Sequence, residues 1–214
     1  MQLLSKELSN RIIIGIIYAS VFLLASLSKE IIFLITFLSF ILIISLFEFY
    51  NITKKTKNLL FKFFVPIFYL LIPISCLFLI KFQFEKNLLT YLLILIWISD
   101  ISAFIIGKLF GKIQLSNISP NKTIEGFIGS LLVCTLTGPL VIIYLNIELN
   151  INLYLLSFLI SISGNFGDFV ESILKRKFNQ KDSGTILMSH GGILDRIDSL
   201  LISGPLFYYI LNQS

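Results

Sequence analysis

Two pairs of carboxylates stand out in the last quarter of this sequence, because each pair has helical spacing. Asp168 and Glu171 are three residues apart, and Asp195 and Asp198 repeat that spacing. Residues three apart share a helix face, so each pair presents two acids side by side. Both pairs adjoin strongly apolar stretches, where a carboxylate costs about 2.5–3.5 kcal/mol even on a lenient insertion scale. Carboxylates that are present despite this free-energy cost of membrane insertion indicate a functional site.

Two explanations are open for how these acids are tolerated. Four carboxylates brought together would repel one another and favour their protonated forms unless a divalent cation lay between them. Oxygen ligands without histidine or cysteine suit Mg²⁺ better than Zn²⁺. The spacing is also compatible with an ion-pair network, in which the four acids face the four cations Lys175, Arg176, Lys181 and Arg196.

The basic residues near these acids have a second use, which is to hold phosphates. They fall in two groups of three: Lys175, Arg176 and Lys181, and Lys108, Lys112 and Lys122. Membrane orientation or lipid headgroup contact explains each of them singly. His190 precedes Gly191 and Gly192, a pair typical of a tight turn, and a lone histidine is more often structural. Taken together, the charges favour phosphoryl or nucleotidyl transfer.

The elements that carry these residues belong to a membrane protein. Of the 214 residues, 56% are hydrophobic and 14% are charged, and the mean hydropathy is +0.92. Soluble domains contain about 25% charged residues, and a soluble body of this size could not bury so much apolar surface. We therefore expect one all-α integral membrane domain. The net charge of +5 is explained by membrane orientation, and no nucleic acid partner is expected.

Seven apolar segments are expected to form a polytopic bundle of transmembrane helices. Crossing about 30 Å of hydrocarbon takes about 20 residues. The first and last segments are short, so six spans are the alternative, and the first is interpreted as an uncleaved helix. The segments are 12–27, 31–50, 63–80, 88–106, 124–145, 151–170 and 197–211.

The basic residues divide sharply between alternate connections. Only Lys29, Lys81 and Lys86 fall on one side. The other side holds Lys6, Arg11, Lys54, Lys55, Lys57, Lys62, Lys108, Lys112, Lys122, Lys175, Arg176, Lys177, Lys181 and Arg196. Because basic loops stay inside, the N-terminus and the loops 107–123 and 171–196 are expected in the cytoplasm of a bacterial inner membrane.

The sixth segment carries a narrow polar face. Its members fall within a stripe about 80° wide at 100° per residue. Lipid cannot satisfy such a face, so it must contact protein or water. Small residues are typical of a helix-packing seam, whereas packing does not need the carboxylates. The members are Ser157, Ser161, Gly164, Asp168, Glu171 and Lys175.

Two further predictions concern the ends of the spans. Ser119 followed by Pro120 is interpreted as the N-cap and first residue of the next helix. Five acids outside the last four segments are interpreted as solvated interface residues: Glu7, Glu30, Glu48, Glu85 and Glu148. The N-terminal half is accordingly expected to contribute little to catalysis.

Over about residues 97–200, the sequence resembles the phosphatidate cytidylyltransferase family. The family's signature is matched by Ser172, Lys175, Arg176, Lys181, Asp182, His190, Gly191, Gly192, Asp195, Arg196 and Asp198. The stretch GNFGDFVES, with Asp168 and Glu171, also resembles the family. A third match, SDISAFIIGKLFGK followed by SPNKTIEG, includes Asp100, Gly107, Lys108, Gly111, Ser119, Pro120, Lys122, Thr123 and Glu125. Met188 departs from the pattern.

The resemblance implies a Mg²⁺-dependent transfer of CMP from CTP to phosphatidic acid, which yields CDP-diacylglycerol and pyrophosphate. It implies Asp168, Asp195 and Asp198 as metal ligands, with Glu171 as an outer ligand and room for a second cation. Phosphates would be neutralised by Lys175, Arg176, Lys181 and Arg196. Nucleotide contacts would come from Lys122 and Thr123, while Lys108, Ser172, Asp182, His190, Gly191 and Gly192 complete the expected substrate site.

Residues 1–87 are thus expected to form N-terminal transmembrane helices, and residues 88–214 the catalytic region of the same membrane domain. The rival function is a cation-coupled transporter, because intramembrane carboxylates serve ion passage equally well. A transferase acting on another lipid phosphate is a second rival. A homodimer is compatible with the sequence, which does not fix the oligomeric state.

Overall fold

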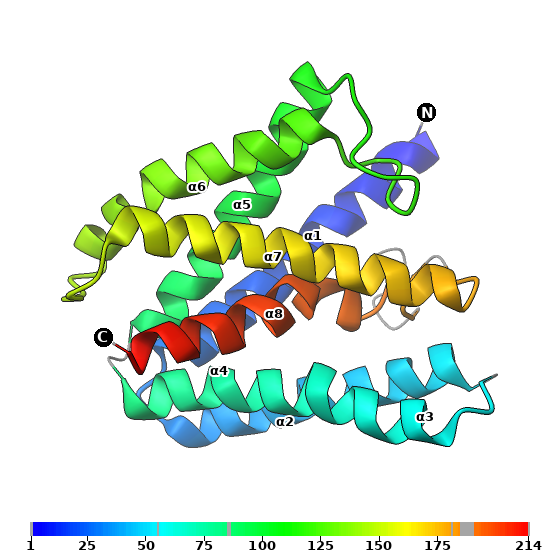
Figure 1. Ribbon diagram of the computed structural model, residues 1–214, viewed down its shortest axis with the longest axis horizontal. Coiled ribbons are helices and arrows are strands. Elements are labelled where there is room, and N and C mark those ends of the chain that lie inside the picture. Colours follow the sequence, from blue (N-terminus) through cyan, green and yellow to red (C-terminus); the bar gives the residue numbers. More distant parts are fainter. Residues whose placement is uncertain (1, 55, 85–86, 181, 185–190, 214) are drawn as a thin grey trace.

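The computed structural model describes residues 2–54, 56–84, 87–180, 182–184 and 191–213, with side chains from Gly15 onward. These residues form a bundle of long helices (Figure 1). In chain order the elements are α1 (Gln2–Leu27), α2 (Ile31–Thr53), α3 (Leu59–Pro66), η1 (Ile67–Leu71), α4 (Ile72–Gln83), α5 (Leu88–Phe110), α6 (Ile124–Tyr144), α7 (Leu153–Lys177) and α8 (Leu194–Leu211).

The elements α3, η1 and α4 follow one another without a break and form one rod. The middle element is a π-helical turn, in which the amide of Ile72 donates to the carbonyl of Ile67, five residues earlier. Pro73 follows directly, and a proline cannot donate the hydrogen bond of a regular helix. The wider turn lets the rod continue past the proline. The described chain therefore contains seven rods, which match the seven predicted segments.

The all-α, polytopic architecture predicted from the sequence is confirmed. Five rods are long and apolar enough to cross a membrane: Ile31–Thr53, Leu59–Gln83, Leu88–Phe110, Ile124–Tyr144 and Leu153–Lys177. The apolar part of α1, Gly15–Leu27, is shorter, and α8 begins with a charged first turn. Many large apolar side chains point outward and are exposed, as expected for helices that contact lipid. The chain is an integral membrane protein.

Successive rods run in opposite directions. The ends of α2, α5 and α7 lie toward the right of Figure 1, and the ends of α4, α6 and α8 toward the left. The predicted alternation of basic connections therefore corresponds to two opposite ends of the molecule. The assignment of one end to the cytoplasm remains a prediction.

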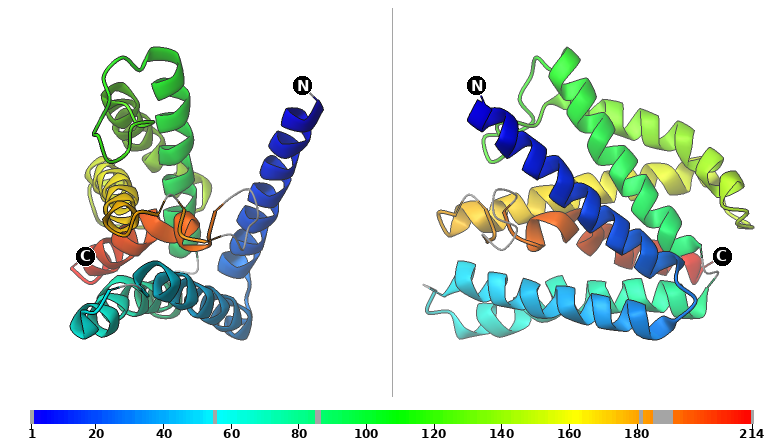
Figure 2. Two further views of the ribbon diagram at one scale, coloured as in Figure 1. Left: turned by 90° about the vertical axis from the view of Figure 1, so that its right-hand side faces the viewer. Right: turned by 180° about the vertical axis from the view of Figure 1, so that it is seen from behind.

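Packing is tightest among the last four helices. The helix α8 lies between α7 and α4, and α5 and α6 pack against each other and against α7. The helix α1 contacts α5 and α2 and slants away from the rest toward its N-terminus (Figure 2). The C-terminal helices thus form the body of the bundle, with the N-terminal rods placed against α5 and α8.

The polar face of α7 meets protein along its length. Toward its start, the hydroxyl of Ser157 lies 3.0 Å from that of Tyr91, and Ser161 lies 2.8 Å from Ser99. Farther along, Gly167 packs against the backbone of Asp198 and Ser199 in α8. The two serines and the buried Gly164 form the helix-packing seam that the sequence allowed, Gly167 adds a contact beside it, and the carboxylates continue the predicted face.

The predicted start of α6 at Ser119 and Pro120 is wrong. The helix begins at Ile124, and its N-cap is Thr123, whose hydroxyl accepts a hydrogen bond from the amide of Gly126 at 3.1 Å. Ser119 and Pro120 form a turn instead, closed by the amide of Lys122 donating to the carbonyl of Ser119 at 3.0 Å. Proline is equally favoured within such a turn, so the dipeptide did not distinguish a turn from a cap.

We expect Gly167→Ala to destabilise the protein by about 1–3 kcal/mol, because a Cβ there collides with the α8 backbone, which cannot rotate away. Thermal unfolding of detergent-purified protein measures the effect. Gly164→Ala is the matched control one turn earlier, where the new Cβ lies 3.7 Å from Ser199 Cβ in ordinary contact. Equal midpoints for the two variants would contradict the proposed close approach.

Candidate active site

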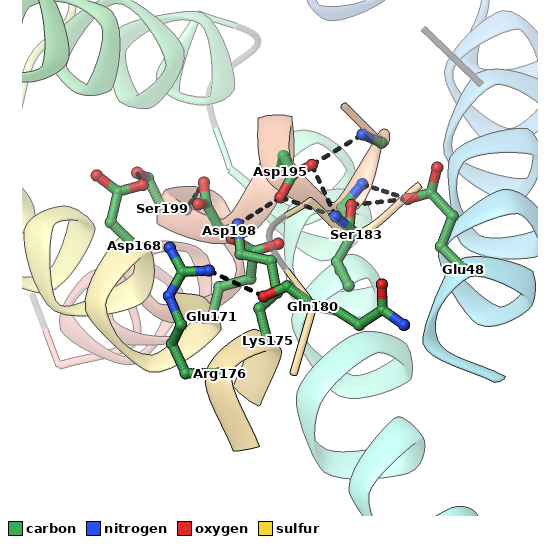
Figure 3. Close-up of polar contacts among 12 residues, drawn as sticks. Glu48, Asp168, Glu171, Lys175, Arg176, Gln180, Ser183, Asp195, Asp198 and Ser199 are labelled. Atoms are coloured by element: carbon green, nitrogen blue, oxygen red, sulfur yellow. Dashed lines mark hydrogen bonds and ion pairs between the residues drawn. The ribbon is translucent and has the colours of Figure 1, made fainter. Parts of the chain in front are cut away.

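One lysine joins the two carboxylate pairs. Lys175 Nζ lies 2.6 Å from Glu171 on its own helix and 2.5 Å from Asp195 on α8. The three side chains are largely buried, with 12%, 1% and 12% of their surfaces exposed, respectively. Figure 3 shows them meeting between the two helices. The acids predicted to converge from α7 and α8 do lie together, and a shared cation holds them.

A second lysine reaches the cluster from the loop before α6. Lys122 Nζ lies 2.6 Å from Asp168 Oδ2, while Ser199 of α8 donates to Asp168 Oδ1 at 3.2 Å. Asp198 of α8 lines the same two cavities as Asp168. Part of the ion-pair network considered from the sequence is thus present through Lys175, and Lys122, which was not among its predicted cations, pairs with Asp168.

The loop that carries Lys122 is fixed at both of its ends. Gln114 pairs with Thr123 through an isolated β-bridge, and Glu125 accepts from the amide of Ile113 at 3.3 Å. At the start of α6, Gly126 lies against the carbonyl of Ala103, where a Cβ would stand only 2.6 Å away. The close contact between α5 and α6 therefore fixes the loop in a position from which Lys122 reaches α7.

Asp195 is held in place by backbone amides as well as by Lys175. Its Oδ2 accepts from the amide of Gly192 at 2.8 Å and from that of Ser183 at 3.0 Å. Gly191 has a φ of +80°, a conformation that favours glycine. Gly192 delivers its amide to Asp195, while the tight turn predicted at the glycine pair stays a prediction, because the residues just before it lie outside the described part of the chain.

Two cavities meet at the charged cluster. The larger has a volume of about 790 Å³ and extends between α1, α5 and α6, and the smaller has about 240 Å³ beside α7 and α8. Five charged residues line both: Lys122, Asp168, Asp195, Arg196 and Asp198. The larger cavity has an additional apolar wall that includes Trp97, Ile101 and Phe104. The arrangement suits two ligands that meet at a charged junction.

Most of the predicted site residues line one of these cavities. Lys108 and Thr123 border the larger one. Glu171, Ser172, Lys175 and Asp182 border the smaller one. Gly191 and Gly192 act through Asp195, as described above. Lys181 and His190, together with Met188, lie outside the described residues.

Arg176 does not join the acids. Its guanidinium donates to the backbone carbonyl of Gln180 at 2.9 Å and to that of Ile118 at 3.4 Å, and neither cavity includes it. One residue beyond Lys175, its side chain points about 100° away around the helix. In this structure Arg176 ties the end of α7 to the two neighbouring loops, and its predicted catalytic role is not seen in these contacts.

The interpretation of Glu48 as a solvated interface residue is wrong. This residue of α2 is 1% exposed, and its carboxylate accepts hydrogen bonds from the amides of Ile193 and Leu194 at 3.0 and 2.9 Å. The reason is tertiary: α2 packs beside the start of α8, which no local pattern around residue 48 reveals. The N-terminal half therefore contributes to the site after all.

Several residues border the larger cavity without having been assigned a role from the sequence, and three of them bring polar side chains from different helices. Tyr18 of α1 and Asp100 of α5 line it, as does Asn165 of α7. The amide of Asn165 donates to Ser99, Ser130 and the carbonyl of Ser161 at 2.9–3.2 Å. Asn165 lies one turn before Asp168, so the α7 periodicity was the signal that could have found it.

The chemistry of the cluster fits a hard divalent cation. Asp168, Asp195 and Asp198 line both cavities, and the buried Oε1 of Glu171 has no hydrogen-bond partner in the described part of the chain. Carboxylate oxygens are the ligands that Mg²⁺ prefers. Among the described residues, no three acidic, histidine or cysteine side chains are grouped closely enough to hold a metal ion. The metal remains a prediction.

Fold and site together define a polytopic membrane protein with a charged cavity at one end of its helix bundle. A family model described as the cytidylyltransferase family matches residues 14–214, so the chain belongs to that family. The predicted family resemblance is confirmed.

Curated relatives carry a more specific name. A phosphatidate cytidylyltransferase of Staphylococcus haemolyticus (strain JCSC1435) is 48% identical over 127 residues, which are 58% of this chain and 48% of the relative. That of Staphylococcus aureus (strain COL) is 47% identical over 128 residues, with the same two shares. That of Staphylococcus saprophyticus is 48% identical over 124 residues, 56% of this chain and 47% of the relative. The chain spans about half the length of the curated relatives it matches.

We expect Lys175→Ala to destabilise the protein by about 3–5 kcal/mol, because it leaves Glu171 and Asp195 without their shared cation in a largely buried place. Unfolding in detergent measures this loss. Lys57→Ala, an exposed lysine at the same end of the molecule, is the control and should stay near the wild type. A Lys175→Ala protein as stable as the control would contradict the bridging role.

Proposed function

We propose that this protein transfers CMP from CTP to phosphatidic acid, giving CDP-diacylglycerol and pyrophosphate. The observation that carries the proposal is the set of five charged residues shared by the two cavities. Membership of the cytidylyltransferase family and the names of the relatives support it. Such an enzyme needs two binding spaces, one for a nucleotide and one for a lipid, whose phosphates meet at one place.

The lipid substrate enters through the larger cavity. Ile101 and Phe104 line this cavity and are also 59% and 67% exposed on the apolar outer surface. A wall continuous with the lipid-facing surface suits acyl chains. Lys108 borders the same cavity and offers the lipid phosphate a cation.

The phosphates of CTP occupy the smaller cavity. Its lining consists of polar and charged residues from α7, α8 and their connection. Lys175 and Arg196 supply positive charge to a triphosphate, and Lys122 stands at the junction with the larger cavity. The two reacting phosphates then face each other beside Asp168 and Asp198.

In the reaction, an oxygen of the phosphatidate phosphate attacks the α-phosphorus of CTP. A phosphoanhydride bond forms to the lipid, the bond between the α- and β-phosphates breaks, and pyrophosphate leaves with the electron pair. No general base is required, because the attacking phosphate is already an anion. The chain's contribution is to hold both substrates in line and to neutralise charge through its lysines and Arg196.

The acids Asp168, Asp195 and Asp198 would hold a Mg²⁺ ion, with Glu171 orienting the cluster. When bound, the ion supplies positive charge to the phosphate oxygens as charge develops in the transition state. Lys122 and Lys175 neutralise these acids in the structure, so we propose that they turn toward substrate phosphates when the metal binds.

The site lies on the cytoplasmic side of a bacterial inner membrane, where CTP is available. The excess of basic residues at the site's end of the bundle supports this orientation.

We expect Asp168→Asn and Asp195→Asn each to abolish CMP transfer while the protein still inserts into membranes, because each loses a charge that both cavities share. Incorporation of radiolabelled CTP by purified protein, with and without phosphatidic acid, measures the transfer. Lys6→Ala is the control and should be nearly silent. Retention of more than about one tenth of the activity by both variants would contradict the assignment.

Removal of divalent cations should stop the transfer, since Asp168, Glu171 and Asp195 are otherwise neutralised by the lysines that the phosphates need. The same assay after chelation, followed by addition of Mg²⁺, tests this expectation. Full activity in the presence of excess chelator would refute the metal part of the proposal and leave the nucleotide part standing.

A further inference from the structure

Glu48 connects the N-terminal half of the chain to the site. It is 1% exposed, and its two carboxylate oxygens accept from the amides of Ile193 and Leu194, at the very start of α8. The hydroxyl of Ser183 donates to Oε2 at 3.3 Å. A carboxylate at this position satisfies amides that a helix N-terminus leaves unpaired, and it interacts favourably with the helix dipole.

The start of α8 has no cap of its own. Its N-cap residue, Ile193, makes no side-chain hydrogen bond to the first turn. The capping is therefore supplied by a residue 145 positions earlier in the chain. Because the bond spans two separate rods, it fixes the start of α8 relative to α2 rather than merely strengthening α8.

The same contacts lead directly to the charged cluster. Ser183 bonds to Glu48 through its hydroxyl and to Asp195 through its amide. The amide of Gly192, the residue before Ile193, donates to the same Asp195 oxygen at 2.8 Å. Figure 3 shows Glu48, Ser183 and Asp195 in one chain of polar contacts that continues to Lys175. Moving Glu48 would therefore release two of the donors that hold Asp195.

Two glycines make room for this carboxylate. A Cβ at Gly184 would stand 2.7 Å from Glu48 Oε1, and a Cβ at Gly192 would collide with Oε2. Glycine is needed at Gly192 for this close approach rather than for an unusual backbone angle, because positive φ occurs at Gly191. The loop backbone thus closes around the Glu48 carboxylate from both sides.

We propose that Glu48 is a positioning residue for the nucleotide half of the site, which it serves as a clamp that holds Ser183, Gly192 and the start of α8 in place. This inference rests on the proposed function. Glu48 lines neither cavity, so it acts through Asp195 and Lys175 and does not touch a substrate. Lys175 borders only the smaller cavity, Asp195 borders both, and the apolar wall of the larger cavity lies on other helices. Binding of CTP therefore depends on the clamp much more than binding of the lipid does.

The test compares Glu48→Gln with Ser45→Ala in two measurements on the full-length protein in detergent. Glutamine keeps the size of the side chain and loses one acceptor and the charge. Ser45 lies one turn earlier on α2, is fully buried, and makes no hydrogen bond within the described residues. It is therefore a matched control for a change inside the same helix.

The first measurement is hydrogen–deuterium exchange of the segment around residues 191–195, which needs no activity. Glu48→Gln should speed exchange there, and Ser45→Ala should not. Unchanged exchange in Glu48→Gln overturns the proposal whether or not the wild type transfers CMP. Absence of CMP transfer by the wild type would instead remove the proposed function, and the exchange result would still decide the clamp.

The second measurement is steady-state kinetics for each substrate. Glu48→Gln should lower kcat/KM for CTP by about 10- to 100-fold, as expected when reacting groups are misplaced, with the KM for phosphatidic acid nearly unchanged. An equal loss for both substrates would indicate general damage and overturn the positioning role. If Glu48→Gln does not fold, Ser183→Ala removes the hydrogen bond between the Ser183 hydroxyl and Glu48 from the loop side. It should give the same split between the substrates, and no split there would also overturn the proposal.

Discussion

The structure depends on bringing acids from two antiparallel helices together at the end of a membrane bundle. Lys175 makes this arrangement stable, because one ammonium group lies between Glu171 and Asp195. Like charges in so dry a place would otherwise repel strongly. The same requirement links structure to the proposed chemistry, in which a metal ion and substrate phosphates take over the positive and negative charges that the lysines and acids now balance.

The rest of the bundle serves that convergence. Gly167 lets α7 approach the α8 backbone closely, and Ser199 of α8 donates to Asp168 beside it. The close packing of α5 and α6 at Gly126 delivers Lys122 from the opposite side. From the N-terminal half, Glu48 secures the first turn of α8. Each of these contacts joins different rods. The geometry of the charged cluster therefore depends on the packing of the whole bundle and not on one helix.

The sequence predicted what periodicity and composition control. The seven helical rods, the small polar face of α7 and the convergence of Asp168, Glu171, Asp195 and Asp198 follow from apolar runs and helical spacing. It did not predict what depends on contacts between distant segments. Glu48 resembles any acid at the end of a span until α2 is placed beside α8. Ser119 and Thr123 both suit an N-cap by residue type. Which of them caps α6 depends on how the loop packs, and the structure shows that it is Thr123.

A double-mutant cycle on Lys175 and Asp195 tests the central claim most directly. Stability of the wild type, Lys175→Met, Asp195→Asn and the double variant is measured in the same detergent. We predict an interaction energy of about 0.5–3 kcal/mol, because the two side chains share one ion pair across α7 and α8. Additive effects of the two substitutions would show that the lysine does not hold the helices' acids together and would contradict the account.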